Sequence, residues 1–203
     1  MGFRKRLLEI PRVYDSVLST VYRPGFRNLF VNELINASSN MRVLDVGCGT
    51  ADILNRLPPV DYVGLDANPD YLEVARARYG SLGTFANTDV VGKEFSNLGR
   101  FDRILLLGVL HHLADEECAG LLSALATGLK PDGFLITLDP AYEDNQHPIS
   151  WMVSKLDRGR FVRHHRKYHE MISENFVVEI AHLKHDFLRV PSTTALHRAI
   201  ART

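Results

Sequence analysis

Two adjacent histidines, His111 and His112, follow the long apolar stretch "FDRILLLGVL" and are well suited to proton transfer. An imidazole titrates close to neutral pH, so a histidine can take a proton from a nucleophile under physiological conditions. Neighbouring residues on an extended segment point to opposite sides, so one of the two is expected to face a substrate. Asp139, at the end of "FLITLDP", is a candidate to orient that histidine or to bind substrate. Loop packing for the histidines, and a cap or turn role for Asp139, are the structural alternatives.

A glycine turn in "VLDVGCGTAD" is the second chemical feature, because Gly47 and Gly49 follow a short apolar run. The dinucleotide-binding pattern G-x-G-x-x-G needs a third glycine, and Asp52 stands in its place, where its charge would oppose a pyrophosphate. No G-K-[ST] follows, so the phosphate-binding loop of nucleotide triphosphatases is also excluded. The ligand is therefore expected to lack a diphosphate, which disfavours a nicotinamide-dependent oxidoreductase. An ordinary tight turn without a ligand is the alternative.

Three carboxylates near the ends of neighbouring apolar runs narrow the choice of ligand. Asp66 stands where a carboxylate accepts hydrogen bonds from ribose hydroxyls, although it could instead cap the following helix. Asp89 could accept from an adenine amine or remain a solvated loop residue, and Asp45 could face a cation directly or through water. A nucleoside with a cationic tail fits this set, and S-adenosylmethionine is such a ligand.

Alternating apolar and helical patterns predict the elements that position these residues. Apolar runs rich in branched side chains are typical of parallel strands buried on both faces, and strand–helix alternation indicates a doubly wound α/β sheet. Ligands bind such sheets at the carboxyl ends of the strands. Strands are expected at 40–47, 60–67, 84–90, 101–110, 134–140, 177–188 and 193–202. Helices are expected at 50–57, 68–80, 114–133 and 168–176, and within 5–37 with breaks at Pro11 and Pro24.

The stretches "VLDVGCGTAD", "YVGLDANPDYLEVAR", "NTDV", "FDRILLLGVLHHL" and "LKPDGFLITLDP" resemble the successive motifs of class I S-adenosylmethionine-dependent methyltransferases. Their order and spacing agree over about residues 41–140. The resemblance implies a Rossmann-like sheet of seven strands, mostly parallel with the last antiparallel, and helices on both faces. It also implies S-adenosylmethionine as cofactor and S-adenosylhomocysteine as product.

The resemblance further implies roles for the residues that match its motifs. Gly47 and Gly49 would border the methionyl part of the cofactor, and Asp66 would hold the ribose. The other implied cofactor contacts are Ala67 and Val90 beside the adenine, Asp89 at its amine, the backbone of Leu107 and Gly108, and Tyr14 or Arg23 in the N-terminal segment.

A basic segment, "SKLDRGRFVRHHRKYHE", follows the resembling region and is expected to determine the methyl acceptor. Guanidinium groups bind carboxylates and phosphates through two parallel hydrogen bonds, which favours a small acidic acceptor. A solvated surface is the alternative reading of such a charge run. The candidate substrate residues are Arg158, Arg160, Arg163 and Arg189, with Trp151 as part of the wall.

The chain is interpreted as one domain over residues 1–203. It has an N-terminal helical cap (1–38), a cofactor-binding core (41–140), an insertion over the active site (141–170) and a C-terminal helix with strands (171–203). Its 24 basic and 24 acidic residues give no net charge, which argues against nucleic-acid binding. Only two cysteines and no bilayer-length apolar run predict a cytoplasmic protein. No carboxylate cluster has magnesium-type spacing, so no metal is expected. A monomer or a homodimer is expected.

The leading functional prediction is methyl transfer to an oxygen of a small molecule with a histidine as base. One alternative is an RNA methyltransferase that docks through the basic segment. Another is a non-catalytic subunit that binds S-adenosylmethionine without acceptor chemistry.

Overall fold

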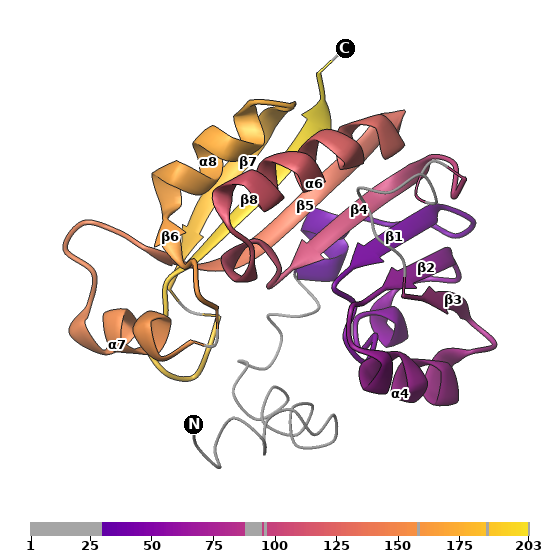
Figure 1. The fold of residues 1–203 in the computed structure, drawn as a ribbon, viewed down its shortest axis with the longest axis horizontal. Coiled ribbons are helices and arrows are strands. Elements are labelled where there is room, and N and C mark those ends of the chain that lie inside the picture. The colour runs from indigo at the N-terminus through magenta and orange to yellow at the C-terminus, as the bar shows by residue number, and fades with distance from the viewer. Residues whose placement is uncertain (1–29, 88–94, 96, 158, 186, 203) are drawn as a thin grey trace.

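A central β-sheet organises the computed structural model, which describes residues 30–87, 95, 97–157, 159–185 and 187–202. Seven strands follow one another in the order β3-β2-β1-β4-β5-β8-β7, and β6 pairs with β5 off this path (Figure 1). The strands are β1 (Arg42–Val46), β2 (Asp61–Leu65), β3 (Gly83–Ala86), β4 (Phe101–Leu107), β5 (Leu129–Tyr142), β6 (Arg163–His164), β7 (Phe176–Lys184) and β8 (Thr194–Ala201).

The direction of the strands agrees with the predicted fold class. Each pair among β1 to β5 in this sheet is parallel, whereas β8 is antiparallel to both β5 and β7. Strands β1 and β4 are almost wholly buried, as their continuous apolar sequences predicted. The prediction of a mostly parallel sheet with an antiparallel last strand is therefore confirmed.

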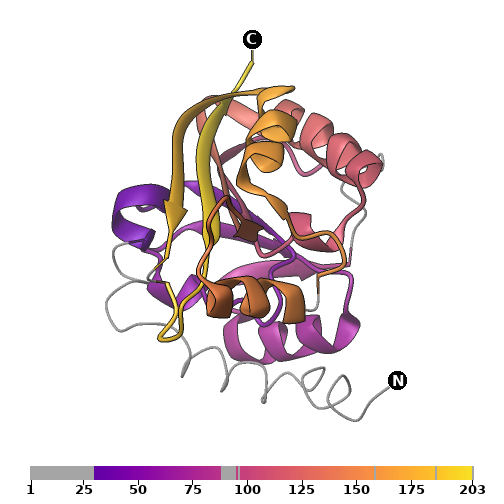
Figure 2. The same cartoon turned by 90° about the vertical axis from the view of Figure 1, so that its left-hand side faces the viewer.

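Helices cover both faces of the sheet, and the sheet separates two apolar cores. Helices α6 (Asp115–Gly128) and α8 (His165–Ser173) pack on one face, and the π-helical turn η1 (Phe30–Ile35) and α4 (Pro69–Tyr79) contribute to the core on the other. Figure 2 shows α6 and α8 on one side of the strands and η1 on the opposite side. Helix α4 begins as predicted, because the Asn68 side chain accepts from the Asp70 amide and Pro69 occupies the first turn.

Two predicted helices are shorter than expected. The helix expected at 50–57 is only the 3₁₀ turn η2 (Leu54–Arg56), because Ala51 has a left-handed φ of +60° and two prolines follow at 58–59. The helix expected to extend to Gly133 ends at Gly128, and the following residues already belong to β5.

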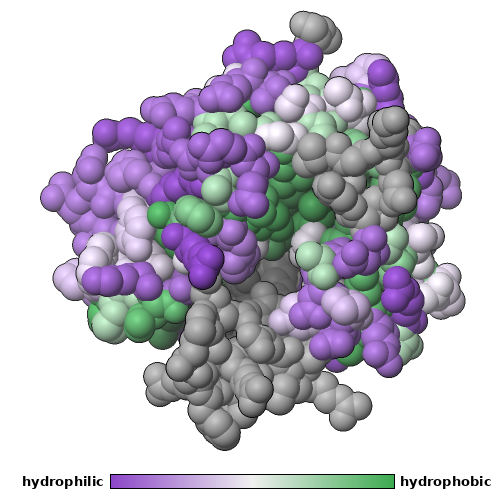
Figure 3. All heavy atoms as spheres, viewed as in Figure 1, coloured by the Kyte–Doolittle hydropathy of each residue, from purple (hydrophilic) through white to green (hydrophobic). Residues whose placement is uncertain are grey.

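The insertion over residues 141–170 contains a helix that the sequence pattern did not reveal, α7 (Pro148–Leu156). Its buried residues are two serines one turn apart. The Ser150 hydroxyl lies 2.8 Å from that of Thr193, and the Ser154 hydroxyl donates to the carbonyl of Ala141 at 3.3 Å. Its large apolar side chains are exposed instead, which gives the apolar surface over α7 in Figure 3. The buried side of α7 is polar and its exposed side is apolar. The sequence therefore has no apolar stripe that would indicate a helix packed against the sheet.

Arg103 attaches η1 to the sheet through hydrogen bonds to backbone carbonyls. The buried guanidinium on β4 donates to the carbonyls of Ile35 at 2.7 Å and Asn36 at 3.1 Å, and it stacks 4.6 Å from the Phe134 ring centroid. We expect Arg103→Met to lower the free energy of unfolding by about 2–3 kcal/mol, because both carbonyls lose their charged donor. Urea denaturation would measure the loss, and hydrogen exchange would show faster opening of residues 31–36.

Arg198→Met is the matched control for this prediction. Arg198 stacks on the same Phe134 ring at 4.6 Å and pairs with Glu179 at 3.3 Å. Its ion-pair partner lies on β7 and not on η1, so its removal should cost about 1 kcal/mol or less and leave exchange at 31–36 unchanged. Equal effects of the two substitutions would contradict the attachment role of Arg103.

Candidate active site

The glycine turn follows β1 and is held against β2. The amides of Gly47 and Cys48 both donate to the carbonyl of Leu65, at 2.7 and 3.0 Å. Gly47 and Gly49 have left-handed φ angles of +72° and +54°, which favour glycine. A Cβ atom at Gly47 would lie 2.7 Å from a methyl group of Val109, whereas a Cβ at Gly49 would meet open space. Packing therefore requires the first glycine, and the second leaves room for a ligand beside the backbone.

Asp66, directly after β2, ties this turn to the start of α4. One of its carboxylate oxygens accepts from the Gly49 amide at 2.8 Å and the other from the Asn68 amide at 2.7 Å. Asn87, after β3, donates to the backbone carbonyl of Asp66 at 2.9 Å, a contact that sequence reasoning missed. The Asp66 side chain stays partly exposed at this edge, as does Ala67 beside it. Asp66 thus has a structural role in the turn and an accessible carboxylate.

Asp45 lies within the sheet layer rather than at its edge. Its carboxylate accepts from the Tyr62 hydroxyl at 2.6 Å, and both side chains are buried. Burial raises the pKa of Asp45 to about 7, against the lowering effect of the Tyr62 bond, and the charge of Asp66 raises it further. A cation nearby would favour the charged form of this carboxyl group.

Gly108 connects the end of β4 to the candidate acid–base residues. Its amide donates to the carbonyl of Leu138 on β5 at 2.7 Å, directly after the Leu107–Leu138 strand pair. A Cβ atom at Gly108 would lie 3.6 Å from Cε1 of His111. The backbone at the end of β4 therefore adjoins the imidazole of His111.

His111 lies between two carboxylates, and only one of them was predicted. Its Nδ1 is 2.7 Å from Oδ1 of Asp139, which also accepts from the His111 amide at 3.1 Å. Its Nε2 is 3.1 Å from Oδ1 of Asp157, the residue that follows α7. The side chain of Asp139 is 2% exposed, whereas that of Asp157 is 35% exposed. The structure thus brings His111 and Asp139 together, as the sequence suggested, and adds Asp157.

The two carboxylates hold a proton on His111. Burial lowers the pKa of His111, but the hydrogen bonds and charges of Asp139 and Asp157 outweigh that effect and raise the pKa to about 9. At neutral pH the ring is therefore an imidazolium, with a proton on each nitrogen, and donates to both carboxylates. In this arrangement His111 is an acid and a hydrogen-bond donor, not a base.

His112 differs from its neighbour in exposure. Its ring is exposed and lies with its centroid 4.0 Å from that of His111. The two histidines lie in the 3₁₀ turn η3 (Leu110–His112) and not on an extended segment, so their rings lie side by side and the expectation of opposite sides is wrong. That only one of them faces the acceptor stays a prediction.

Gly159 allows the insertion to approach His111. A Cβ atom at this position would lie 2.0 Å from Cδ2 of the His111 ring and 2.6 Å from its carbonyl oxygen. The Gly159 amide donates to Oδ1 of Asp157 at 2.7 Å, and the Phe161 amide donates to the carbonyl of His111 at 2.9 Å. A single glycine within a basic run gave little reason to expect this contact from the sequence.

Arg163 was predicted as a clamp for an acidic substrate, and the structure gives it another role. Its side chain is buried, and all five N–H donors are used. They bond the carboxylate of Asp115 and three backbone carbonyls, those of Leu110, Leu113 and Phe161. Arg163 therefore fastens the insertion to the loop after β4, and no donor is left for a substrate.

The remaining predicted substrate residues that the structure describes lie on its surface. Trp151 is 47% exposed on α7 and lies under the ammonium group of Lys155, 4.5 Å from its ring centroid. Arg160 and Arg189 are exposed. Four predicted site residues lie outside the described part of the chain: Tyr14, Asp89, Val90 and Arg158.

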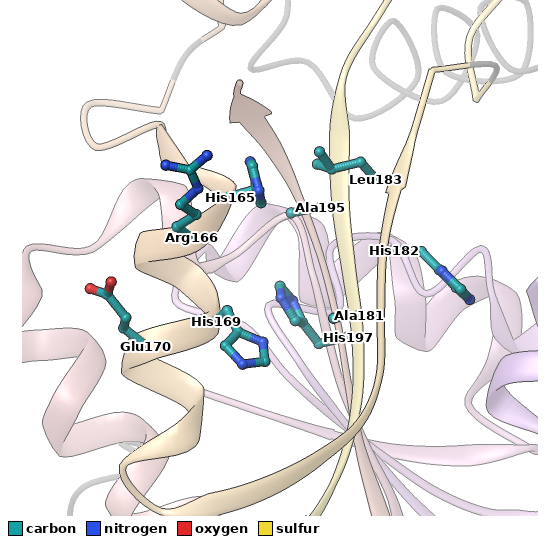
Figure 4. Close-up of a pocket in the computed structure, with 9 residues that line it drawn as sticks. All are labelled: His165, Arg166, His169, Glu170, Ala181, His182, Leu183, Ala195 and His197. Carbon is teal, nitrogen blue, oxygen red and sulfur yellow. The ribbon is translucent and has the colours of Figure 1, made fainter. Parts of the chain in front are cut away.

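A cavity of about 530 Å³ lies between α8 and the strands β7 and β8. Figure 4 shows His197 of β8 pointing toward His169 of α8, with their ring centroids 5.9 Å apart. His197 is buried and its Nδ1 lies 3.2 Å from the Thr137 hydroxyl. Burial lowers the pKa of His197 to about 4, and the charges of His169 and His165 add to the effect. Neither His111 nor Asp139 lines this cavity.

The described residues offer neither a metal site nor a membrane-spanning helix. Within that part of the chain, no group of three or more His, Cys, Asp or Glu side chains is placed to hold a metal ion. No described helix is long and apolar enough to cross a membrane.

Known proteins share both the sequence motifs and the fold. Residues 44–135 match the family described as a methyltransferase domain. A crystal structure of a TehB-like S-adenosylmethionine-dependent methyltransferase from Corynebacterium glutamicum superposes with a TM-score of 0.72 and 15% identity, covering 98% of this chain and 100% of that one. The N-methyltransferase NodS from Bradyrhizobium japonicum, in complex with S-adenosylhomocysteine, gives 0.67 and 16% identity, covering 87% and 86%.

The sheet order and the glycine turn define a Rossmann-like methyltransferase fold. Over residues 44–135 the chain is similar to the methyltransferase-domain family, and its fold is similar to those of solved S-adenosylmethionine-dependent methyltransferases. Among curated relatives, it is 32% identical over 117 residues to N-terminal Xaa-Pro-Lys N-methyltransferase 1 of Xenopus tropicalis, which covers 54% of this chain. The match spans about half of that relative, 51% of its length.

The low pKa of His197 predicts an acid-sensitive fold. The folded pKa is about 4 and the unfolded value about 6.5, so the unfolded chain binds more protons between these pH values. Stability from the neutral ring is complete above pH 6.5 and is lost as the pH falls toward 4. We expect His197 to account for a loss of about 2 kcal/mol in the free energy of unfolding between pH 7 and pH 5.

Denaturation of the wild type and His197→Gln at both pH values would measure this loss. The variant should lose about 2 kcal/mol less than the wild type over this interval. His169→Gln, which removes an exposed histidine from the opposite wall, is the control and should keep most of the wild-type pH dependence. Identical pH dependence in the wild type and His197→Gln would contradict the assignment.

Proposed function

We propose that the protein is an S-adenosylmethionine-dependent methyltransferase that acts on an oxygen of a small, acidic molecule. The family and fold support the methyl-transfer reaction. The cofactor would lie along the carboxyl ends of β1, β2 and β4, against Gly47, Gly49 and the backbone of Leu107 and Gly108. The open space at Gly49 and the accessible carboxylate of Asp66 fit a nucleoside there. The bound cofactor would supply an electrophilic methyl group.

The contact between His111 and Asp139 carries the proposal for the acceptor site. The 2.7 Å bond fixes the imidazole orientation and directs Nε2 away from the β5 strand, beside the end of β4. Holding the acceptor oxygen and the methyl group in line accounts for much of the acceleration in such a displacement. His111 is the described residue best placed to hold that oxygen, with Asp139 as its positioning residue.

The protonation of His111 decides which acceptors this site can serve. An acceptor that binds as a neutral hydroxyl needs a base. His111 can act as that base only after Nε2 loses its proton and its contact with Asp157. An acceptor that arrives as an oxyanion needs no base, and an imidazolium stabilises it directly. The predicted histidine-base mechanism thus requires a change at Asp157, whereas an anionic acceptor does not.

The structure gives less support to the alternative of an RNA methyltransferase. Several cations of the basic segment are paired within the chain: Arg163 with Asp115, Arg166 with Asp144 at 2.8 Å, and Lys167 with Asp115 at 3.5 Å. Internal neutralisation leaves fewer cations for phosphate contacts. A non-catalytic subunit would bind the cofactor equally well, so turnover of an acceptor is the observation that separates it from an enzyme.

Cofactor binding can be tested by calorimetric titration with S-adenosylmethionine, S-adenosylhomocysteine and NAD. We expect both sulfur nucleosides to bind and NAD not to bind. Asp66→Asn should weaken binding of both nucleosides by roughly tenfold or more, because ribose hydroxyls lose a charged acceptor.

Asp61→Asn is the matched control, since Asp61 begins the same strand at the opposite edge and pairs with Arg42 at 2.6 Å. It should leave both affinities unchanged. Equal weakening by the two substitutions, or binding of NAD alone, would overturn the proposed cofactor site.

A further inference from the structure

Asp157 places a carboxylate oxygen between the ring of His111 and the backbone of Gly159. Its Oδ1 lies 3.1 Å from Nε2 of His111 and 2.7 Å from the backbone nitrogen of Gly159. Two N–H donors thus converge on a single carboxylate oxygen, one from an imidazolium and one from the backbone. Paired donors of this kind are how proteins hold oxyanions.

We propose that Asp157 is an internal stand-in for the substrate, and that the methyl acceptor is a carboxylic acid whose carboxylate replaces that of Asp157 between His111 Nε2 and the Gly159 amide. The inference rests on the proposed methyltransferase function and adds the substrate class. Its product is a methyl ester.

The two carboxylates on His111 differ in how readily they can leave. Asp139 is almost fully buried on β5 and accepts two bonds from His111, so it is fixed. Asp157 follows the last residue of α7 and keeps about a third of its side chain in solvent. Rotation of the Asp157 side chain would move its charge into water and free both donors. The ring of His111 is therefore bonded to one fixed carboxylate, that of Asp139, and to one that a substrate could replace, that of Asp157.

The number of charged partners of His111 favours a carboxylate over a neutral acceptor. With Asp157 in place, the carboxylates of Asp139 and Asp157 flank one imidazolium, and exposed His112 lies beside the ring. The charge of Arg163 is compensated by Asp115. A carboxylate that takes the place of Asp157 leaves the imidazolium with two charged partners. A neutral hydroxyl would leave the imidazolium with one charged partner instead of two.

The reaction needs no proton transfer. The acceptor carboxylate oxygen would form a bond to the methyl carbon, the carbon–sulfur bond would break, and its electron pair would stay on sulfur. S-adenosylhomocysteine and the methyl ester are the products, and the positive sulfonium charge and the negative carboxylate charge cancel. His111 would keep both protons throughout and would hold the oxyanion in line.

Carboxylate binding can be measured without turnover, using sodium benzoate and its neutral amide, benzamide. We expect benzoate to perturb the NMR signals of the His111 ring, and to bind Asp157→Ala roughly tenfold more tightly than the wild type, because the internal competitor is gone. Benzamide should bind neither protein measurably. Asp144→Ala is the control, since Asp144 belongs to the same insertion but pairs with Arg166 and His164.

Equal affinity of benzoate for the wild type and Asp157→Ala would overturn the inference. Binding of benzamide as tight as that of benzoate would overturn it too. A melting temperature for each variant would show that it is folded. Titration with S-adenosylhomocysteine separates the two proposals. If the nucleoside binds and benzoate does not, only the acceptor assignment fails. If the nucleoside does not bind, the proposed function fails.

The dependence of turnover on pH gives a second, independent readout. With S-adenosylmethionine and a panel of carboxylic acids, kcat/KM should fall as the pH rises through the pKa of His111, near 9, because the deprotonated ring no longer donates from Nε2. A histidine acting as a base would give the opposite slope. Rates that rise with pH, together with methyl ethers from hydroxyl acceptors and no esters, would contradict the carboxylate assignment.

Discussion

The pairing of β4 with β5 is the constraint on which the candidate site depends. Leu107 pairs with Leu138, and the next amide, that of Gly108, donates to the Leu138 carbonyl at 2.7 Å. This register places the exit of β4 opposite Asp139, so that His111 meets that carboxylate. A slip of one residue would turn Asp139 to the other face of the sheet and remove the contact. Burial of the apolar strands fixes the register of β4 against β5, and this register places His111 beside Asp139.

Arg163 fixes the position of the insertion relative to β4 and β5. Its guanidinium bonds the carbonyls of Leu110 and Leu113 on either side of the histidine pair, and its own strand β6 pairs with the end of β5. A buried cation that satisfies several carbonyls at once is costly to remove, since each carbonyl would lose its donor. Arg163 therefore holds the insertion beside His111, where Asp157 and Gly159 contact the histidine.

The sequence predicted most of the fold because buried parallel strands leave a strong pattern, and each predicted strand of the core is present. It also indicated that Asp139 could orient one of the two histidines, since these residues follow adjacent strands, and the structure pairs it with His111. It could not predict Asp157, whose contact depends on how α7 packs through serines rather than apolar residues. It predicted Arg163 as a substrate clamp, because the backbone carbonyls of Leu110 and Leu113 that bind its guanidinium are distant in the sequence and carry no signal in it.

The histidines of this chain show why residue type alone cannot assign a role. His111 and His197 are both buried, yet two carboxylates raise the pKa of the first to about 9, and an apolar wall with neighbouring imidazoles lowers that of the second to about 4. Between these values, the first ring is a cation and the second is neutral. A cationic ring beside the carboxyl edge of the sheet is chemically suited to hold an oxyanion. The presence of an internal carboxylate already bound to that ring is the strongest structural argument for the chemistry of its acceptor.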